Sequence, residues 1–499
     1  MNKSKKKERK LLFIKFAAMI ASVFCCCLLY ANNDAVYAKE KDATVKFENS
    51  DGDDEKTVSQ VVRVTDFFVK NSHISCYGLN KNQKFDFQKL PNGTLELLCY
   101  NGNDPHPIIP KSISINSKEF AVQSLGDDAF SNFPVKSVVI PSSVRSIGDR
   151  CFRENSLLSS INIPQGVRSL GHACFSNCEL LREAHLPNSL ESIGDCCFGR
   201  CSSLELINIS PGVISLGCEC FYGCTSLKEV HLPNSLKSIG DRCFDGCSSL
   251  NSISIPESIM LLEGKCFFGC MSLREVHLPS FLKSIGDCCF GGCLSLNSIS
   301  IPEGITSLSY GCFYNCTSLK EINLPDSLKS IDKHCFQGCS SLDFISIPEG
   351  VTLLGQDCFY DCMSLREVHL PNSLKSIGKH CFEKCSSLNS ISIPEGIMLL
   401  KGGCFYGCTS LKEVHLPNLL KSIGKHCFQG CLSLDFISIP ENVTSLDQDC
   451  FYDCMSLREA HLPNSLESIG SSCFEGCLSL NSVTIPEGVT SLKDKCFCN

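Results

Sequence analysis

One pattern recurs every 23 residues from Pro141 to the end of the chain. It reads P-x2-[LIV]-x2-[IL]-x3-C-F-x2-C-x2-L-x2-[IVA]-x-[IL], and it starts sixteen units in strict register, with Ser210 the only replacement of the proline. A fixed period of about 20 to 50 residues is typical of solenoids, in which each unit stacks on its neighbours. We therefore do not expect the 499 residues to divide into ordinary globular domains.

A single unit has too few apolar residues to enclose a core. In the unit that starts at Pro256 they are Ile259, Leu262, Cys266, Phe267, Cys270, Leu273, Val276 and Leu278. Such a set makes one layer, which is shielded from water only by the layers on either side. The sequence therefore predicts a continuous core that runs along a stack of coils.

Each unit contains one clear strand signal. Residues 273–278 alternate apolar and polar side chains, which is typical of a short strand, and Pro279 ends it because proline cannot extend the hydrogen-bonded ladder. The Cys-Phe-x-x-Cys segment is expected to return on the opposite side as a tight helical turn. Stacked parallel strands advance by about 4.8 Å each, so sixteen coils predict a rod or arc about 75 Å long.

A second period of 46 residues lies on top of the first. Units of the type HLPNSLKSIG alternate with units of the type SIPEGVTSL, and residues 343–369 nearly repeat as residues 435–461, 92 positions later. The array therefore has the pattern of repeated block duplication.

The repeat resembles a known family. Residues 140–152 read IPSSVRSIGDRCF and residues 125–130 read LGDDAF, similar to the IP-x-SV-T-x-IG-x-x-AF-x-GC-x-SL units of the BspA-like, or treponemal-type, leucine-rich repeat family. The resemblance covers about residues 76–499. It implies an α/β-type leucine-rich repeat solenoid, mostly short parallel strands with tight turns or short helical turns. It also implies a surface or secreted protein that adheres to host proteins, matrix proteins or other cells. The departure is a cysteine in place of alanine before the phenylalanine in nearly all units.

The first 38 residues have the layout of a secretory signal peptide. A basic run (residues 3–10) precedes an apolar stretch (residues 16–31) and small side chains at Val36 and Ala38, which predicts cleavage after Ala38. The alternative is an uncleaved anchor, because the apolar stretch of about 16 residues is only slightly shorter than a spanning helix of about 20.

Three segments follow the signal. Residues 39–75 are polar and acidic and predict a flexible spacer. Residues 76–117 predict an N-terminal β-hairpin cap, since two alternating runs surround Asn92 and Gly93. Residues 118–499 predict the leucine-rich repeat solenoid, about 16 units with no clear C-terminal cap. An open last coil suggests end-to-end self-association as a further contact.

Net charge excludes some partners. Deleting residues 1–38 removes seven basic and two acidic residues and changes the formal charge from −8 to −13. So acidic a protein is poorly suited to nucleic acid or to an anionic membrane surface. We expect no nucleic-acid partner and no membrane insertion after signal cleavage.

The chain has 39 cysteines, most of them paired as C-F-x-x-C, and three interpretations are open. They are small apolar core residues, disulfides permitted by export, or metal ligands, suggested by a histidine before Cys335, Cys381 and Cys427. Equivalent side chains on stacked coils point the same way, which disfavours a disulfide ladder, and identical layers spread ligands along a line, whereas zinc needs them to converge. The sequence favours core packing and predicts no cofactor.

Polar residues beside the central apolar residue of each strand are expected to face the concave side. The candidate ligand-binding residues are Glu183, His185, Glu229, His231, Glu275, His277, Phe344, Glu367, His369, Glu413, His415, Phe436, Glu459 and His461. Near-copies about 9.6 Å apart, with no nucleophile or oxyanion feature, do not make one catalytic site. We therefore expect no enzyme.

The sequence favours a secreted or cell-surface binding scaffold that contacts an extracellular protein or glycan, on a host or a neighbouring cell, by weak contacts summed along the array. The alternative is a passive structural spacer with variable repeats.

Overall fold

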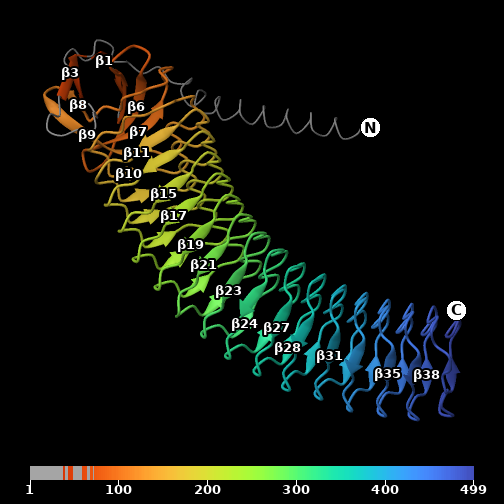
Figure 1. The fold of residues 1–499 in the computed structure, drawn as a ribbon. Coiled ribbons are helices and arrows are strands. Elements are labelled where there is room, and N and C mark those ends of the chain that lie inside the picture. The colour runs from red at the N-terminus through yellow and green to blue at the C-terminus, as the bar shows by residue number, and fades with distance from the viewer. Residues whose placement is uncertain (1–37, 40–42, 49–58, 64–67, 71, 499) are drawn as a thin grey trace, which may run out of the picture.

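The computed structural model describes residues 38–39, 43–48, 59–63, 68–70 and 72–498. Successive coils stack from an N-terminal unit to the last coil and form a long arc (Figure 1). The strands of neighbouring coils are parallel and 23 residues apart, as in the pair Ser169 and Ser192. The predicted solenoid is confirmed. The predicted signal peptide lies outside the described residues, except for Ala38.

Each coil contributes a first strand of three residues, whose middle residue points inward and is buried or half-buried. These strands are β11 (Ser160–Asn162), β13 (Glu183–His185), β15 (Leu206–Asn208), β17 (Glu229–His231), β19 (Ser252–Ser254), β21 (Glu275–His277), β23 (Ser298–Ser300), β25 (Glu321–Asn323), β27 (Phe344–Ser346), β29 (Glu367–His369), β31 (Ser390–Ser392), β33 (Glu413–His415), β35 (Phe436–Ser438) and β37 (Glu459–His461). They pair two by two, as β27 does with β29.

A short turn that begins at the repeat proline leads to a second strand of two residues. These strands are β10 (Ser146–Ile147), β12 (Ser169–Leu170), β14 (Ser192–Ile193), β16 (Ser215–Leu216), β18 (Ser238–Ile239), β20 (Leu261–Leu262), β22 (Ser284–Ile285), β24 (Ser307–Leu308), β26 (Ser330–Ile331), β28 (Leu353–Leu354), β30 (Ser376–Ile377), β32 (Leu399–Leu400), β34 (Ser422–Ile423), β36 (Ser445–Leu446), β38 (Ser468–Ile469) and β39 (Ser491–Leu492). They form sheets separate from those of the first strands. The outward side chains of the two sets therefore lie on two different faces of each coil.

A long turn carries the Cys-Phe-x-x-Cys segment back to the next first strand, and no helix forms in it or elsewhere in the described residues. Arg150 and Glu154 have φ of 53° and 62°. The amides of Arg150 and Phe152 donate hydrogen bonds to the carbonyls of His172 and Cys174 in the next coil. The amides of Arg153 and Asn155 donate to the carbonyls of Arg150 and Phe152, three residues back, so the i to i−4 ladder of an α-helix does not form. The tight turns are confirmed, and the helical turn is wrong.

The core is a ladder of identical layers. The phenylalanines of the Cys-Phe pairs stack on one another from Phe152 to Phe497, and Phe130, which follows Ala129, begins the stack; ring centroids are 5.1 to 5.6 Å apart. Both cysteines of a unit flank this stack and are buried, as are Cys358 and Cys362. The cysteines that flank the stack are free thiols. The structure thus corresponds to the core-packing interpretation.

The N-terminal unit is built from β1 (Ala38–Lys39), β2 (Ala43–Glu48), β3 (Ser59–Arg63), β4 (Phe68–Lys70), β5 (His73–Tyr77), β6 (Lys84–Lys89), β7 (Leu95–Tyr100), β8 (Ser112–Ile115) and β9 (Lys118–Leu125). Strands β6 and β7 form an antiparallel hairpin around Asn92 and Gly93. β9 pairs parallel with both β7 and β10, so this sheet continues into the solenoid and closes its first coil.

Residues 39–75 are not a continuous flexible spacer. They contain strands β2, β3 and β4, and β2 lies between β3 and β8. Its Val45 and Phe47 are buried in the core. The short run ATVKFE alternates apolar and polar residues, but its acidic surroundings mask that signal in the composition. The spacer prediction is therefore wrong where these strands lie.

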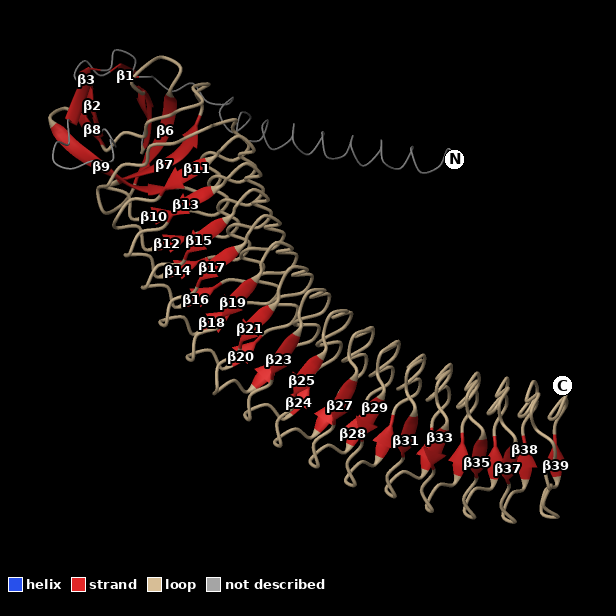
Figure 2. Ribbon diagram, viewed as in Figure 1, coloured by secondary structure: helices blue, strands red, loops and turns tan. Residues whose placement is uncertain are grey.

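The arc places turns, not strands, along its inner side. In Figure 2 the long turns line the inner side, where the C-terminus also lies, and the short turns line the outer side. The strands lie between these edges, on the flanks of the coils. The expectation that the first strands face the concave side is therefore not met. Among the described residues no helix has the length and apolar character needed to cross a membrane.

Candidate binding surface

The outward residues of the first strands form a surface that we call the Glu/His face. On β29, Glu367 and His369 flank the buried Val368 and are themselves well exposed, with side chains 62% and 60% accessible. The same pattern holds on β13, β17, β21, β33 and β37. Every predicted glutamate and histidine is therefore on the surface, because the period of two in a strand turns both outward when the residue between them is buried.

Glutamate and histidine contact each other along the strand. The His Nε2 to Glu Oε distances are 3.7 Å for His185 and Glu183, 2.8 Å for His231 and Glu229, 2.7 Å for His369 and Glu367, 3.2 Å for His415 and Glu413, and 2.5 Å for His461 and Glu459. These pairs are exposed, so each contributes little to stability. They occur on five separate coils, β13, β17, β29, β33 and β37, and do not converge on a single centre.

Two aromatic clusters interrupt this regular pattern. The ring of Phe344 lies 5.1 Å from that of His369 and nearly perpendicular to it, at 84°. Phe436 and His461 repeat this geometry, at 5.1 Å and 90°. Both phenylalanines are 43% exposed, although their neighbours on the sheet are polar. An exposed aromatic ring held against a partner ring is typical of an interaction hot spot.

A basic column borders the Glu/His face, and it was missed in the sequence interpretation. The residue before each glutamate is an exposed lysine or arginine: Arg182, Lys228, Arg274, Lys320, Arg366, Lys412 and Arg458. Lys228 Nζ lies 2.9 Å from Glu205 in the preceding coil, and this hydrogen bond holds the pKa of Glu205 below its usual value. Each such coil thus presents a cation, a carboxylate and an imidazole in a row, except that Asn323 replaces the histidine in the coil of Lys320.

The long-turn edge carries a second set of histidines, each beside a buried cysteine. His334 lies 3.6 Å from Asp357, His380 lies 2.6 Å from Glu383, and His426 lies 3.3 Å from Asp449. The cysteines that follow them point into the core instead. Within the described parts of the chain, no group of three or more His, Cys, Asp or Glu residues is arranged to hold a metal ion.

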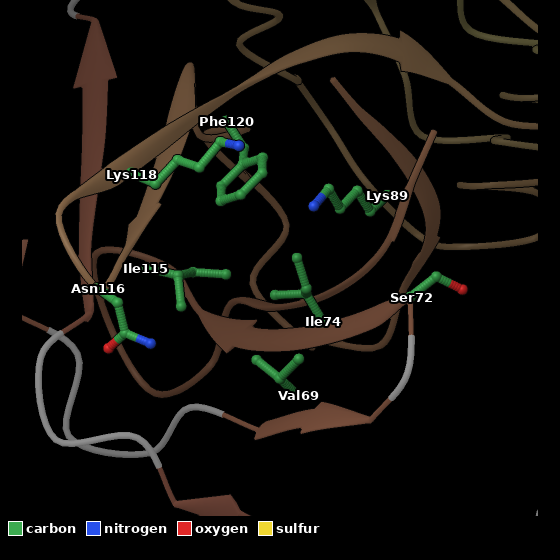
Figure 3. Close-up of a pocket in the computed structure, with 8 residues that line it drawn as sticks. All are labelled: Val69, Ser72, Ile74, Lys89, Ile115, Asn116, Lys118 and Phe120. Atoms are coloured by element: carbon green, nitrogen blue, oxygen red, sulfur yellow. The ribbon is translucent and has the colours of Figure 1, made fainter. Parts of the chain in front are cut away.

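The N-terminal unit contains a cavity of about 360 Å³ that the repeat pattern does not predict (Figure 3). Lys89 Nζ lies 4.7 Å from the centre of the Phe120 ring, and Lys118 Nζ lies 5.6 Å from it. The lining residues are Val69, Ser72, Ile74, Lys89, Ile115, Asn116, Lys118 and Phe120. The cavity belongs to the cap, apart from the Glu/His face.

The family model of the BspA type leucine rich repeat region matches the chain in overlapping stretches: residues 110–227, 192–320, 261–389, 306–431 and 375–499. No curated protein matches the chain in sequence.

Three solved structures of bacterial repeat proteins are similar to the chain. A leucine-rich repeat protein from Bacteroides ovatus is 29% identical with a TM-score of 0.54, over 81% of this chain and 93% of that one. The T. pallidum leucine rich repeat protein is 26% identical with a TM-score of 0.33, over 44% of this chain and 90% of that one. A leucine rich cell surface protein from Faecalibacterium prausnitzii is 21% identical with a TM-score of 0.30, over 82% and 92%.

Proposed function

Because the chain belongs to the BspA-type leucine-rich repeat family, we propose that it is a binding scaffold outside the cell, which holds an extracellular protein or glycan along its Glu/His face. The observation that carries this proposal is the pair of exposed aromatic clusters, Phe344 with His369 and Phe436 with His461. They lie four coils apart, about 19 Å along the array. Two rigid contact points at that separation suit an extended macromolecule better than a small molecule.

The repeated chemistry of the face supports binding rather than catalysis. Each Glu and His pair has near-identical copies on other coils, and none has a nucleophile or a buried neighbour that distinguishes it. Catalysis needs one site with a defined set of groups, whereas multivalent binding gains from many similar ones. Location outside the cell is supported by the signal-like residues 1–38.

The experiment measures saturable binding of the full secreted chain to immobilised extracellular-matrix proteins and to intact cells. The test variant carries Phe344→Ser, Phe436→Ser, His369→Asn and His461→Asn. Other coils already have these residues at the same positions: Ser390 corresponds to Phe344, and Asn323 corresponds to His369. The substitutions are therefore expected to preserve the fold. Losing two aromatic anchors should weaken binding about tenfold or more.

The matched control replaces exposed apolar residues on the other sheet, Met260→Thr and Met398→Thr, since Thr352 occupies the same position in its own coil. We expect this variant to bind normally. A passive spacer would show no saturable binding in any arm, which would refute the proposal.

Shortening the array tests multivalency. Deleting residues 343–434 joins Leu342 to Asp435, the same Leu-Asp junction that occurs naturally at 434–435, and removes one of the two aromatic clusters. The binding constant should fall, because the second contact no longer adds to the first. Unchanged affinity would show that the clusters do not act together.

A further inference from the structure

The second strands carry a column of lysines on the other face. The residue just before the strand is exposed in every second coil as Lys237, Lys283, Lys329, Lys375 and Lys421. The coils between them carry Ile214, Met260, Thr306, Thr352 and Met398 at the same position. This column lies on a different sheet from the Glu/His face.

Backbone hydrogen bonds hold the column in register. The amide of Thr352 donates to the carbonyl of Lys329 at 3.0 Å, and the amide of Lys375 donates to the carbonyl of Thr352 at 2.9 Å. Lys421 bonds to Met398 in the same way, at 2.9 Å. Successive lysines are therefore two coils apart, about 9.6 Å along the array.

A second column, four residues further along each coil, changes sign along the chain. It is acidic in the earlier coils, at Asp195, Asp241 and Asp287, and basic in the later ones, at Lys333, Lys379 and Lys425. In the later coils both columns are therefore lysine. We call the surface formed by Lys329, Lys333, Lys375, Lys379, Lys421 and Lys425 the lysine face.

The six ammonium groups are exposed and have no carboxylate partner. None of them forms an ion pair within the described parts of the chain, whereas Lys228, for example, does so with Glu205. Six uncompensated positive charges, two in each of three coils, therefore lie on a chain whose formal net charge is −8. Such a surface is complementary to a polymer of negative charges.

Exposed apolar side chains occur in the coils between the lysine rows, next to Thr352 in the first of these coils. Leu353, Met398 and Leu399 lie in the intervening coils and are 41%, 53% and 46% exposed. A ligand that follows the array thus meets a charged row, then an apolar row, then a charged row. Double-stranded nucleic acid does not match this alternation, because each strand carries a charge about every 3.4 Å.

We propose that the lysine face binds an acidic polysaccharide that lies along the array and carries its acidic group on every second sugar. The coil rise of about 4.8 Å is close to the advance of one sugar in an extended β-linked chain, so two coils span one disaccharide. The acidic sugar then meets a lysine row, and the apolar ring face of the next sugar meets Leu353 or Met398. Three rows bind three successive disaccharides, and their weak contacts add.

The test uses the full chain and hyaluronan oligosaccharides, whose carboxylates lie on alternate sugars, with dextran as the neutral reference. The variant Lys333→Asp, Lys379→Asp, Lys425→Asp restores the acidic residue that Asp241 and Asp287 provide in earlier coils. It should weaken hyaluronan binding about tenfold or more, because three weak ionic contacts become repulsive. Binding of the intact chain should also fall as salt increases.

The matched control is Lys320→Asp, Arg366→Asp, Lys412→Asp in the basic column that borders the Glu/His face. It makes the same change in net charge, and Asp343 and Asp435 already occupy that position in neighbouring coils. We expect its affinity to stay within about twofold of the intact chain. Equal weakening by both variants would mean that only net charge matters, and would overturn the proposal.

Two further outcomes would also overturn it. One is equal or tighter binding of duplex DNA, and the other is equal or tighter binding of phosphatidylserine vesicles, each with the same dependence on Lys333, Lys379 and Lys425. The Phe344 and Phe436 variant of the Glu/His face should bind hyaluronan normally. The binding proposal for the lysine face can therefore fail while the proposal for the Glu/His face holds, and the reverse.

Discussion

The thiol of Cys362 donates a hydrogen bond of 3.2 Å to the carbonyl oxygen of Phe336 in the preceding coil. The second cysteine of the unit makes the same contact in coil after coil, from Cys178 to Cys477. This cysteine therefore fills the space of a small apolar residue and also satisfies a backbone carbonyl at the edge of the phenylalanine stack. A disulfide would remove the donor.

Thiol labelling should separate two classes of cysteine. Cys218 and Cys498 are exposed, so they should react with iodoacetamide in the native protein within minutes. The cysteines of the phenylalanine ladder should stay unmodified until the protein is denatured, and should then all react. Mass spectrometry of native and denatured samples measures both numbers. Thiols that remain blocked after denaturation without reductant would show that disulfides exist.

Stability should fall steeply in alkaline solution. Burial raises the pKa of Cys178 and of Cys316 from 9.0 to about 12. In the unfolded chain these thiols ionise above pH 9, whereas in the folded chain they stay neutral. Their contribution is therefore complete below pH 9 and is lost as the pH rises toward 12. Each thiol adds a slope of about 1.4 kcal/mol per pH unit in that window.

Urea unfolding at several pH values between 7.5 and 10.5 measures this loss. A variant with Cys178→Ala and Cys316→Ala removes two of the titrating groups, so its stability should depend less on pH above 9, even though it starts less stable. A free energy of unfolding that stays constant from pH 8 to 10.5 in the intact chain would contradict the prediction.

Local patterns predict burial in this chain better than they predict shape. The alternation in residues 273–278 identifies the strand that the structure shows as β21, with Val276 inward and His277 outward. Such a pattern depends on each coil and its two neighbours, so it can be read from one unit. The direction of curvature instead arises from small differences between the two edges, summed over all coils. The sequence of a single unit therefore does not predict which face of the coils lies on the concave side of the arc.

The long turn shows a second limit. Cysteine and phenylalanine at that spacing are equally compatible with one helical turn or with consecutive tight turns. The decisive factor is that the amide of Phe152 bonds to Cys174 in the next coil, a contact 22 residues away in sequence. The lysine columns were missed for a different reason, since exposed residues carry no packing signal and become meaningful only when the stack places them side by side.

The buried phenylalanines of the stack should contribute strongly to the free energy of unfolding, and the exposed phenylalanines should contribute little. The ring of Phe336 lies 5.6 Å from that of Phe313 and 5.3 Å from that of Phe359, and it is fully buried. Phe336→Ala should therefore cost about 3 to 5 kcal/mol. Phe344→Ala, on the surface eight residues later, should cost no more than about 0.5 kcal/mol. Hydrogen exchange of both variants measures the loss coil by coil, and similar effects at both positions would contradict this assignment.

Close contact between coils should make Gly378 intolerant of any side chain. A Cβ atom there would lie 2.4 Å from the backbone of Gly355 and Gln356 in the preceding coil, closer than any real contact. Since backbone atoms on both sides are held by hydrogen bonds to neighbouring coils, they cannot move aside cheaply. We expect Gly378→Ala to cost about 3 kcal/mol, as overpacking does elsewhere.

Gly430 provides the matched comparison. It has a φ of +72°, but a Cβ there would meet nothing nearer than 3.8 Å, and Asn315 occupies the equivalent position in an earlier coil with a φ of 55°. Gly430→Asn should therefore cost less than about 1 kcal/mol, because asparagine tolerates left-handed backbone. Thermal and urea unfolding of the two variants side by side measures the difference. If Gly430→Asn were as destabilising as Gly378→Ala, backbone conformation rather than the contact between coils would control both positions.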